Sequence, residues 1–302
     1  MKRNIVFIVN PIAGTRPKND LRLYLEKRAN AAGIEHHILH SNADGDYTAL
    51  KTMIAELHIT DVVVCGGDGT LNAIAAALMG INVNIGIIPV GSGNGLARSA
   101  GIPMKPSKAL DIIFGGKWQH IDSFYINNQF SCMLSGLGFD AQIAHNFAAQ
   151  TSRGLVTYTQ QSLIQFFKAK PYQFEIQLPD FAFYTDAFFI SVANSNQFGN
   201  NFTIAPKASL TDGLLDIVIV QKMNKAKLPF AILKQVRGNN KLQKLVDDMQ
   251  KQNVVYLQTP EIKIRNIQHA PFHIDGDPKE TADYFDIKIT PSAIRLLMPA
   301  HG

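Results

Sequence analysis

Apolar and polar positions alternate in blocks along the N-terminal part of the chain, up to Gly116. Three short, mostly apolar runs have the length and composition of strands, and they occupy residues 4–10, 61–65 and 84–90. Residues 34–39 predict a further short strand. Four other segments place apolar residues at helical spacing, namely residues 21–32, 46–57, 70–78 and 107–114. Because alternating strands and helices are typical of a parallel sheet, the pattern predicts a Rossmann-like parallel α/β domain.

The rest of the chain is rich in strands but lacks that alternation. Residues 118–126 and 129–134 predict a hairpin that turns at Asn127-Asn128. Further strands are expected at residues 172–178, 183–193, 215–220, 261–267, 272–275, 284–289 and 293–298, and helices at residues 139–150, 155–168 and 228–250, the last interrupted near Gly238. This pattern predicts an antiparallel β-sandwich with helical insertions. The boundary falls between residues 117 and 125, so we expect an α/β domain at 1–122 and a sandwich domain at 123–302.

Three of the predicted parallel strands end in loops of small residues. The loops are Asn10-Pro11-Ile12-Ala13-Gly14, Gly66-Gly67-Asp68-Gly69-Thr70 and Gly91-Ser92-Gly93-Asn94. Ligands of open parallel sheets bind outside the carboxyl ends of the strands, so all three loops are expected to converge at one edge. Glycine lets the backbone approach a ligand closely, and free N–H groups at a helix start suit a phosphate. None of the loops matches the P-loop pattern or the full dinucleotide fingerprint.

Asp68 is unexpected in a loop built for phosphate, because a carboxylate repels that group. An acid at such a position more often holds Mg²⁺ or accepts a proton. The alternative is that Asp68 only caps the helix that follows. Arg16 and Lys18 follow the first loop and would neutralise phosphate charge, as would Arg98 after the third, although each is equally explained as a solvated surface charge.

Composition narrows the classes of function. The chain has 302 residues, 46% of them hydrophobic and 18% charged, with a formal net charge of +5, which allows two domains with large cores. The basic excess favours weak attraction to anionic lipids or nucleotides, but it is scattered and gives no support for nucleic-acid binding.

Two cysteines, Cys65 and Cys132, have no metal-type spacing, which indicates a reduced compartment and no zinc site. The longest apolar stretches, such as Ala73–Met79, fall far short of the roughly 20 residues that span a membrane. The sequence therefore predicts a cytoplasmic protein that touches the inner face of a membrane without crossing it.

The three loops, in this order and spacing, resemble the diacylglycerol kinase catalytic-domain superfamily. That group includes bacterial diacylglycerol kinases, YegS-like lipid kinases, and sphingosine and ceramide kinases. Later stretches agree with it, namely Ser135–Ala141, Ala205-Pro206, Thr211–Asp216 and Ile274–Asp277. The resemblance covers essentially the whole chain.

The resemblance implies an enzyme that transfers the γ-phosphate of ATP, with Mg²⁺, to a hydroxyl of a lipid such as diacylglycerol or a sphingoid base. It places the lipid site against the C-terminal sandwich and the nucleotide site on the N-terminal domain. The implied nucleotide residues are Asn10, Pro11, Gly14, Arg16, Gly66, Gly67, Gly69, Thr70, Gly91, Ser92, Gly93 and Asn94. Asp212 matches a position that binds a structural Mg²⁺ in bacterial members. Related bacterial enzymes dimerise, so a homodimer stays open.

Three departures from the family pattern bear on the substrate and the chemistry. Bacterial diacylglycerol kinases usually carry Asn-Asp where this chain has Asn94-Gly95, and the change is closer to sphingosine kinases. Asp277 replaces a glutamate that is the proposed base. A glycine-rich run expected before Ala205-Pro206 is represented by Gly199-Asn200-Asn201. The aspartate-glycine turn at Asp212 nevertheless favours the glycerolipid enzymes.

Asp68 and Asp277 are the two candidates for the catalytic base, and the sequence favours Asp68 because it lies in the phosphate loop itself. A pair of carboxylates with Mg²⁺ between them is also consistent. The apolar stripe in residues 155–167 would line an acyl-chain site, although such a helical stripe more often belongs to the core. Two other functions stay open: a kinase of a soluble metabolite such as NAD, and a nucleotide or lipid sensor without turnover.

Overall fold

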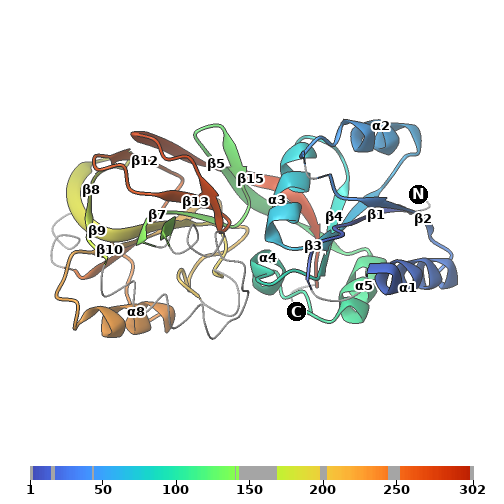
Figure 1. Cartoon of the computed structure of the whole chain (residues 1–302), viewed down its shortest axis with the longest axis horizontal. Coiled ribbons are helices and arrows are strands. Elements are labelled where there is room, and N and C mark those ends of the chain that lie inside the picture. The colour runs from blue at the N-terminus through green and yellow to red at the C-terminus, as the bar shows by residue number, and fades with distance from the viewer. Residues whose placement is uncertain are drawn as a thin grey trace. The chain divides into compact units, whose positions relative to one another are not determined.

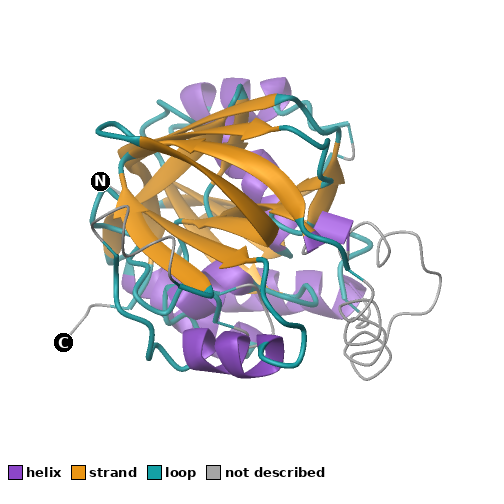
Figure 2. Ribbon diagram, turned by 90° about the vertical axis from the view of Figure 1, so that its left-hand side faces the viewer, coloured by secondary structure: helices purple, strands orange, loops and turns teal. Residues whose placement is uncertain are grey.

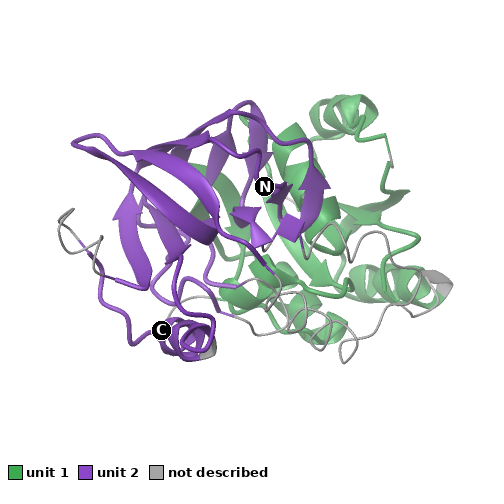
Figure 3. Ribbon diagram, turned by 60° about the vertical axis from the view of Figure 1, so that its left-hand side comes forward, with its two compact units in different colours: residues 1–122, 199–201, 291–302 green, residues 123–198, 202–290 purple. Residues whose placement is uncertain are grey.

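The structure is a computed structural model that describes residues 3–14, 18–42, 44–139, 141–142, 169–197, 203–243 and 252–299. The chain divides into two compact units (Figure 3). Unit 1 comprises residues 1–122, 199–201 and 291–302, and unit 2 comprises residues 123–198 and 202–290. The last residues of the chain therefore belong with the N-terminal unit, although the sequence pattern assigned them to the second domain.

Unit 1 is a parallel sheet with helices on both faces (Figure 1). Its strands are β1 (Asn4–Val9), β2 (Glu35–His40), β3 (Asp61–Gly66) and β4 (Asn84–Pro89), in the order β2-β1-β3-β4. Its helices are α1 (Lys18–Ala31), α2 (Thr48–Glu56), α3 (Asp68–Ala77), α4 (Gly95–Ser99) and α5 (Pro106–Gly115). β1 and β3 are buried along their whole length, as expected for strands covered on both faces.

One core cluster of unit 1 joins the sheet to α1 and α5. Phe7 of β1, Val63 of β3 and Ile88 of β4 pack there with Leu25 of α1 and Ile113 of α5. On the opposite face lie α2 and α3 (Figure 1). This packing confirms the predicted parallel α/β arrangement.

Unit 2 is built mainly of antiparallel strands (Figure 2). They are β5 (Trp118–Ile126), β6 (Gln129–Ser131), β7 (Leu134–Gly138), β8 (Tyr172–Gln177), β9 (Ala182–Ala193), β10 (Leu215–Gln221), β11 (Val254–Thr259), β12 (Glu261–Asn266), β13 (Phe272–Ile274), β14 (Asp277–Lys279) and β15 (Tyr284–Leu297). Two of them are shared with unit 1, to which residues 118–122 of β5 and 291–297 of β15 belong. The pairing order is β14-β13-β7-β9-β8-β12-β15, and β10 lies between β9 and β11. The antiparallel second half is thereby confirmed.

Several predicted elements of this half were wrong in detail. The two strands expected at residues 284–289 and 293–298 are one strand, β15, which continues through Pro291. Of the helix expected at 228–250, the first part is α8 (Leu228–Val236), and the interruption expected near Gly238 is confirmed, since Gly238 adopts a positive φ of 71°, the usual glycine signal for a helix end. Residues 244–250 lie outside the described residues. β7, β11 and β14 were missed. The helices expected at 139–150 and 155–168 lie almost entirely outside the described residues.

None of the helices in the described ranges has both the length and the apolar character that a membrane span requires.

Candidate active site

Three loops of unit 1 follow neighbouring strands and meet at the carboxyl edge of its sheet, as the sequence pattern predicted. β1, β3 and β4 are adjacent and end at Val9, Gly66 and Pro89. The side chain of Asn10 donates a hydrogen bond of 2.7 Å to Thr70 Oγ1. The loops after β1 and β3 are therefore held together by a direct side-chain contact.

The second and third loops touch through two glycines. A Cβ atom placed on Gly91 would lie 2.4 Å from the Cα of Gly67, and one placed on Gly66 would lie 2.9 Å from the Cβ of Thr70. Such distances are too short for real side chains, so the contact requires bare backbone at these positions. The glycines thus have a packing role, and they also leave the start of α3 uncovered by side chains.

Asp68 caps a helix other than its own. α3 begins at Asp68, with Gly67 as its N-cap, two residues before the start expected at Thr70. The carboxylate of Asp68 instead accepts backbone hydrogen bonds from Gly95, at 3.0 Å, and Leu96, at 3.4 Å. These two residues open α4, so Asp68 satisfies N–H groups that a short helix leaves without partners.

The surroundings of Asp68 contain some groups that raise its pKa and others that lower it. Burial raises the pKa of Asp68, while hydrogen bonds from the backbone of Gly95, Leu96 and Asn94 and the charge of Arg98 act to lower it. Burial is the larger cause, and the net pKa is raised. The carboxylate is therefore engaged by the protein on both oxygens and is costlier to ionise than a surface aspartate.

The third loop is tied down by its own side chains. Asn94 has a positive φ of 52°, and its amide both accepts a hydrogen bond from Gly91 N–H and donates one to Gly91 C=O. Arg98 donates to the carbonyl of Gly93 at 3.2 Å. Ser92 remains exposed at the loop tip. Of the two predicted nucleotide contacts, Asn94 uses its side chain to hydrogen-bond Gly91 within the loop, whereas Ser92 is exposed to solvent.

Of the other predicted nucleotide residues, some are described by the structure and Arg16 is not. Pro11 and Gly69 are exposed, and Gly14 adopts a positive φ of 66°. Arg16 lies outside the described residues, as does the side chain of Lys18. The predicted source of positive charge at the first loop is thus not described.

Asp277 lies in unit 2, next to a turn that the sequence analysis overlooked. Asp275 and Gly276 have φ angles of 51° and 85°, as in the tight two-residue hairpin that favours Asp-Gly, here joining β13 to β14. Asp275 Oδ1 accepts hydrogen bonds from Ser131 Oγ, at 2.9 Å, and Leu134 N–H, at 3.0 Å. Asp275 anchors the hairpin, and the exposed Asp277 follows it. The Asp275-Gly276 dipeptide is the sequence signal that predicts this turn.

Asp212, the predicted Mg²⁺ ligand, is exposed and accepts a hydrogen bond of 3.1 Å from Leu214 N–H. Near it lies Asp216, which is fully buried and which the sequence analysis did not single out. Asp216 accepts hydrogen bonds from Tyr256 Oη, at 2.5 Å, and from Gln258 Nε2, at 3.1 Å. Burial raises the pKa of Asp216 to about 6, and the negative charge of Asp212 adds to that rise.

Within the described residues, no three His, Cys, Asp or Glu side chains are grouped closely enough to hold a metal ion. The negative charges of Asp212 and Asp216 repel each other, and a bound cation would offset that repulsion. Gly199-Asn200-Asn201 and the apolar stripe at 155–167 lie outside the described residues.

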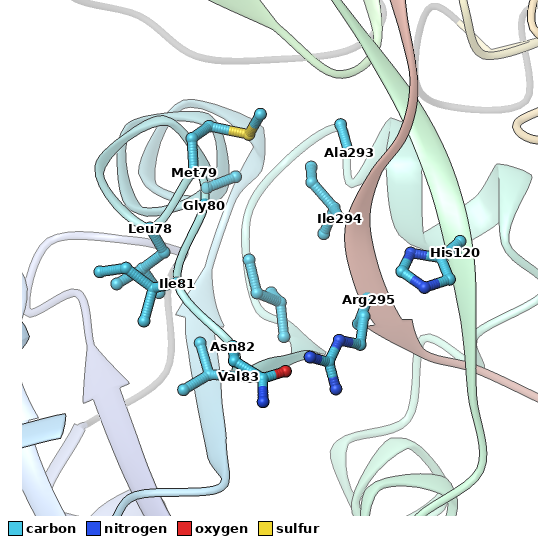
Figure 4. Close-up of a pocket in the computed structure, with 12 residues that line it drawn as sticks. Leu78, Met79, Gly80, Ile81, Asn82, Val83, His120, Ala293, Ile294 and Arg295 are labelled. Carbon is cyan, nitrogen blue, oxygen red and sulfur yellow. The ribbon is translucent and has the colours of Figure 1, made fainter. Parts of the chain in front are cut away.

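A separate cavity of about 210 Å³ lies in unit 1, away from the glycine loops. Its walls come from the C-terminal end of α3, the start of β4 and residues 293–295 of β15, and Asn82, His120 and Arg295 contribute polar side chains (Figure 4). Since the glycine loops lie at the opposite end of α3 and of β4, this cavity is not the predicted nucleotide site.

Comparison with known proteins identifies two family matches that follow one another along the chain. Residues 4–126 match the diacylglycerol kinase catalytic domain, and residues 134–298 match the YegS C-terminal NAD kinase beta sandwich-like domain. The chain is 30% identical over 274 residues to a probable lipid kinase YegS-like of Pectobacterium atrosepticum, covering 87% of each chain. It is 28% identical over 266 residues to one of Chromohalobacter salexigens, covering 84% of this chain and 81% of that one.

A similar fold is found in a putative diacylglycerol kinase from Bacillus anthracis. The TM-score is 0.79 at 23% sequence identity, covering 99% of this chain and 97% of that chain. At this identity the likeness shows the fold alone.

Proposed function

This chain belongs to the YegS-like family of proteins with a diacylglycerol kinase catalytic domain, and on that premise we propose that it is a lipid kinase. It would transfer the γ-phosphate of ATP to the hydroxyl of a lipid, either diacylglycerol or a sphingoid base. The observation that carries the proposal is the contact between the Gly67 and Gly91 backbones. It leaves the first turn of α3 accessible at the edge where three loops meet.

The triphosphate would lie at the start of α3. The N–H groups of the first turn of a helix have no partner within the helix, and with the helix dipole they favour an anion. Gly69 and Ser92 are exposed beside this turn. The N–H groups of residues 68–70 are therefore the proposed phosphate contacts, with Asn10 and Asn94 fixing the loops around them.

The roles of the two aspartates follow from their partners. Asp68 has both oxygens occupied by backbone N–H groups of α4, which supports a role in positioning the third loop. Asp277 is exposed at the start of β14, where its carboxylate is open to a substrate. We therefore assign the proton acceptor to Asp277 and loop positioning to Asp68, which reverses the preference drawn from sequence.

Mg²⁺ has a proposed place at Asp212. Mg²⁺ usually binds one or two carboxylates and keeps several waters, which suits an exposed aspartate next to a buried one. A cation there would supply positive charge that offsets the repulsion between Asp212 and Asp216. These residues fit a structural cation of unit 2, separate from the Mg²⁺ that accompanies ATP.

ADP release from Mg-ATP in mixed micelles tests the proposal, with diacylglycerol or sphingosine as the acceptor. We expect release that depends on lipid and that Asp277→Asn lowers by at least about 10²-fold, as for the loss of a general base. Glu280→Gln, also exposed and three residues away, is the matched control and should leave the rate unchanged.

Two results would contradict the proposal. Release with NAD in buffer but not with lipid micelles would indicate a kinase of a soluble metabolite. ATP binding without ADP release for any acceptor would indicate a sensor.

A further inference from the structure

Helix α8 of unit 2 carries large apolar side chains on its outer face as well as its inner one. Leu228 is fully buried in a core cluster that Ala231 and Ile232 also contact, so one side of the helix is fixed against the sheet. On the other side, Phe230 is 74% exposed and Leu233 is 45% exposed. Residues three apart on a helix are neighbours, so these two side chains form one apolar spot.

The orientation of α8 is held by a polar contact as well. Gln235 is fully buried, and its side chain donates a hydrogen bond of 2.8 Å to the carbonyl of Ile204. It also accepts one of 2.8 Å from Asn240. Rotating α8 to hide Phe230 would break these bonds and expose Leu228, so the exposure of Phe230 is built into the fold.

Exposed cations lie beside the apolar spot. Lys227, Lys234 and Arg237 are exposed, three, four and seven residues from Phe230, which is the spacing of one helix face. In the described part of the chain none of the three makes an ion pair with an acid. The sequence from 222 to 241 holds six basic residues and no Asp or Glu, the six being Lys222, Lys225, Lys227, Lys234, Arg237 and Lys241.

We propose that this α8 face, formed by Lys227, Phe230, Leu233, Lys234 and Arg237, docks on the surface of an anionic lipid bilayer. An interfacial helix combines apolar side chains that enter the boundary of headgroups and acyl chains with Lys and Arg that attract anionic lipids. Phe230 and Leu233 supply the first, and the three cations supply the second. A protein partner would need a matching acidic surface, whereas anionic headgroups provide that charge on any such membrane.

Docking on a bilayer would bring the proposed lipid kinase to its substrate. The biological purpose of the docking rests on the proposed function, but the docking itself does not. Adsorption to a bilayer requires neither ATP nor turnover, so it can be measured independently. Each cation near such a surface contributes roughly 1 kcal/mol, which corresponds to about fivefold in affinity. Loss of two cations should therefore weaken binding by roughly 25-fold.

Vesicle flotation of the full chain without nucleotide tests the proposal. The vesicles contain phosphatidylcholine alone or with 30 mole per cent phosphatidylglycerol, at low and high salt. We expect binding to the anionic vesicles that weakens with salt. Phe230→Ser with Leu233→Ser should lower the affinity at least tenfold while the salt dependence persists. Lys234→Gln with Arg237→Gln should lower it roughly 25-fold at low salt and flatten the salt dependence.

Matched controls come from the same unit. Tyr184→Ser removes an aromatic side chain that is 68% exposed on β9, and Lys263→Gln with Lys288→Gln removes two exposed cations on β12 and β15. These variants should bind vesicles as the unchanged protein does. Thermal unfolding of each variant confirms that it is folded.

The outcomes separate this inference from the proposed function. Unchanged vesicle binding by both α8 variants, or no binding of the unchanged protein to anionic vesicles, would overturn the inference. A change in oligomeric state on mutating Phe230 and Leu233 would overturn it in favour of a second copy of the chain. ADP release in detergent micelles reports the kinase separately, since it should persist in the α8 variants even when vesicle binding is lost.

Discussion

At the scale of single residues, the carboxylate of Asp68 holds the start of α4 from a distance in sequence. Its replacement by alanine leaves the N–H groups of Gly95 and Leu96 without their acceptor. An unsatisfied buried donor costs about 1–3 kcal/mol, so we expect Asp68→Ala to lower the free energy of unfolding by about 2 kcal/mol in urea titrations. Asp44→Ala, at an exposed position of the same unit, should change it by less than about 0.5 kcal/mol. Equal effects would contradict the capping role.

Asp216 should make stability depend on pH. Its pKa is about 6 in the folded protein against an ordinary 3.8, so between these values the folded state binds more protons than the unfolded one. The stabilisation is complete below about pH 3.8 and is lost as pH rises through about 6, by up to roughly 3 kcal/mol. Urea unfolding at pH 4.5 and 7.5 measures the loss, which Asp216→Asn should remove and the exposed Asp180→Asn should not. A loss that survives Asp216→Asn would assign it to another group.

At the scale of elements, the contact between the second and third loops admits no side chain. We expect Gly91→Ala to destabilise the protein by at least about 2 kcal/mol, since the added Cβ would meet the Gly67 backbone at 2.4 Å and overpacking costs typically 1–3 kcal/mol. ATP affinity, measured by calorimetry, should fall with it because both loops move apart.

Gly115 is the matched control for Gly91. It ends α5, has no positive φ and has open space where a Cβ would be. Gly115→Ala should therefore be neutral or stabilising by up to about 1 kcal/mol. A stable Gly91→Ala variant with normal ATP affinity would show that the loops can separate without consequence.

β1, β3 and β4 of unit 1 were predictable because they are buried along nearly their whole length and are mostly apolar in sequence. In unit 2 the signal is weaker. β14 is three residues long, too short for any periodicity. β15 passes through Pro291, which normally marks the end of a strand.

At the scale of the whole molecule, the sequence predicted that the three loops converge but not the contacts within them. The convergence of the loops followed from two things: the alternation of strands and helices along the chain, and the rule that ligands of open parallel sheets bind outside the carboxyl ends of the strands. The engagement of Asp68 with Gly95, and of Asp216 with Tyr256, links residues 27 and 40 positions apart. Such pairs depend on how elements pack, and no spacing rule in a single sequence reports them.

The two candidate aspartates lie in different units, which leads to a prediction about kinetics. Asp68 belongs to unit 1 and Asp277 to unit 2, so their substitutions should affect different parameters if unit 1 positions the nucleotide and unit 2 supplies the base. Asp68→Asn presents an amide N–H₂ to one of the backbone donors, which loosens the third loop. We expect it to weaken ATP binding about tenfold or more, the equivalent of about 1.4 kcal/mol, by calorimetry.

Asp277→Asn should leave the dissociation constant of ATP unchanged and lower kcat at saturating ATP, because a general base contributes only in the transition state. Asp277→Glu keeps a carboxylate with a longer reach, so it should retain kcat within about tenfold, whereas the amide loses about 10²-fold or more. The reverse pattern, with normal ATP affinity and a collapsed kcat in Asp68→Asn and near-normal kcat in Asp277→Asn, would return the role of base to Asp68. In that case the hydrogen bonds that Asp68 accepts from α4 would have to open when substrate binds.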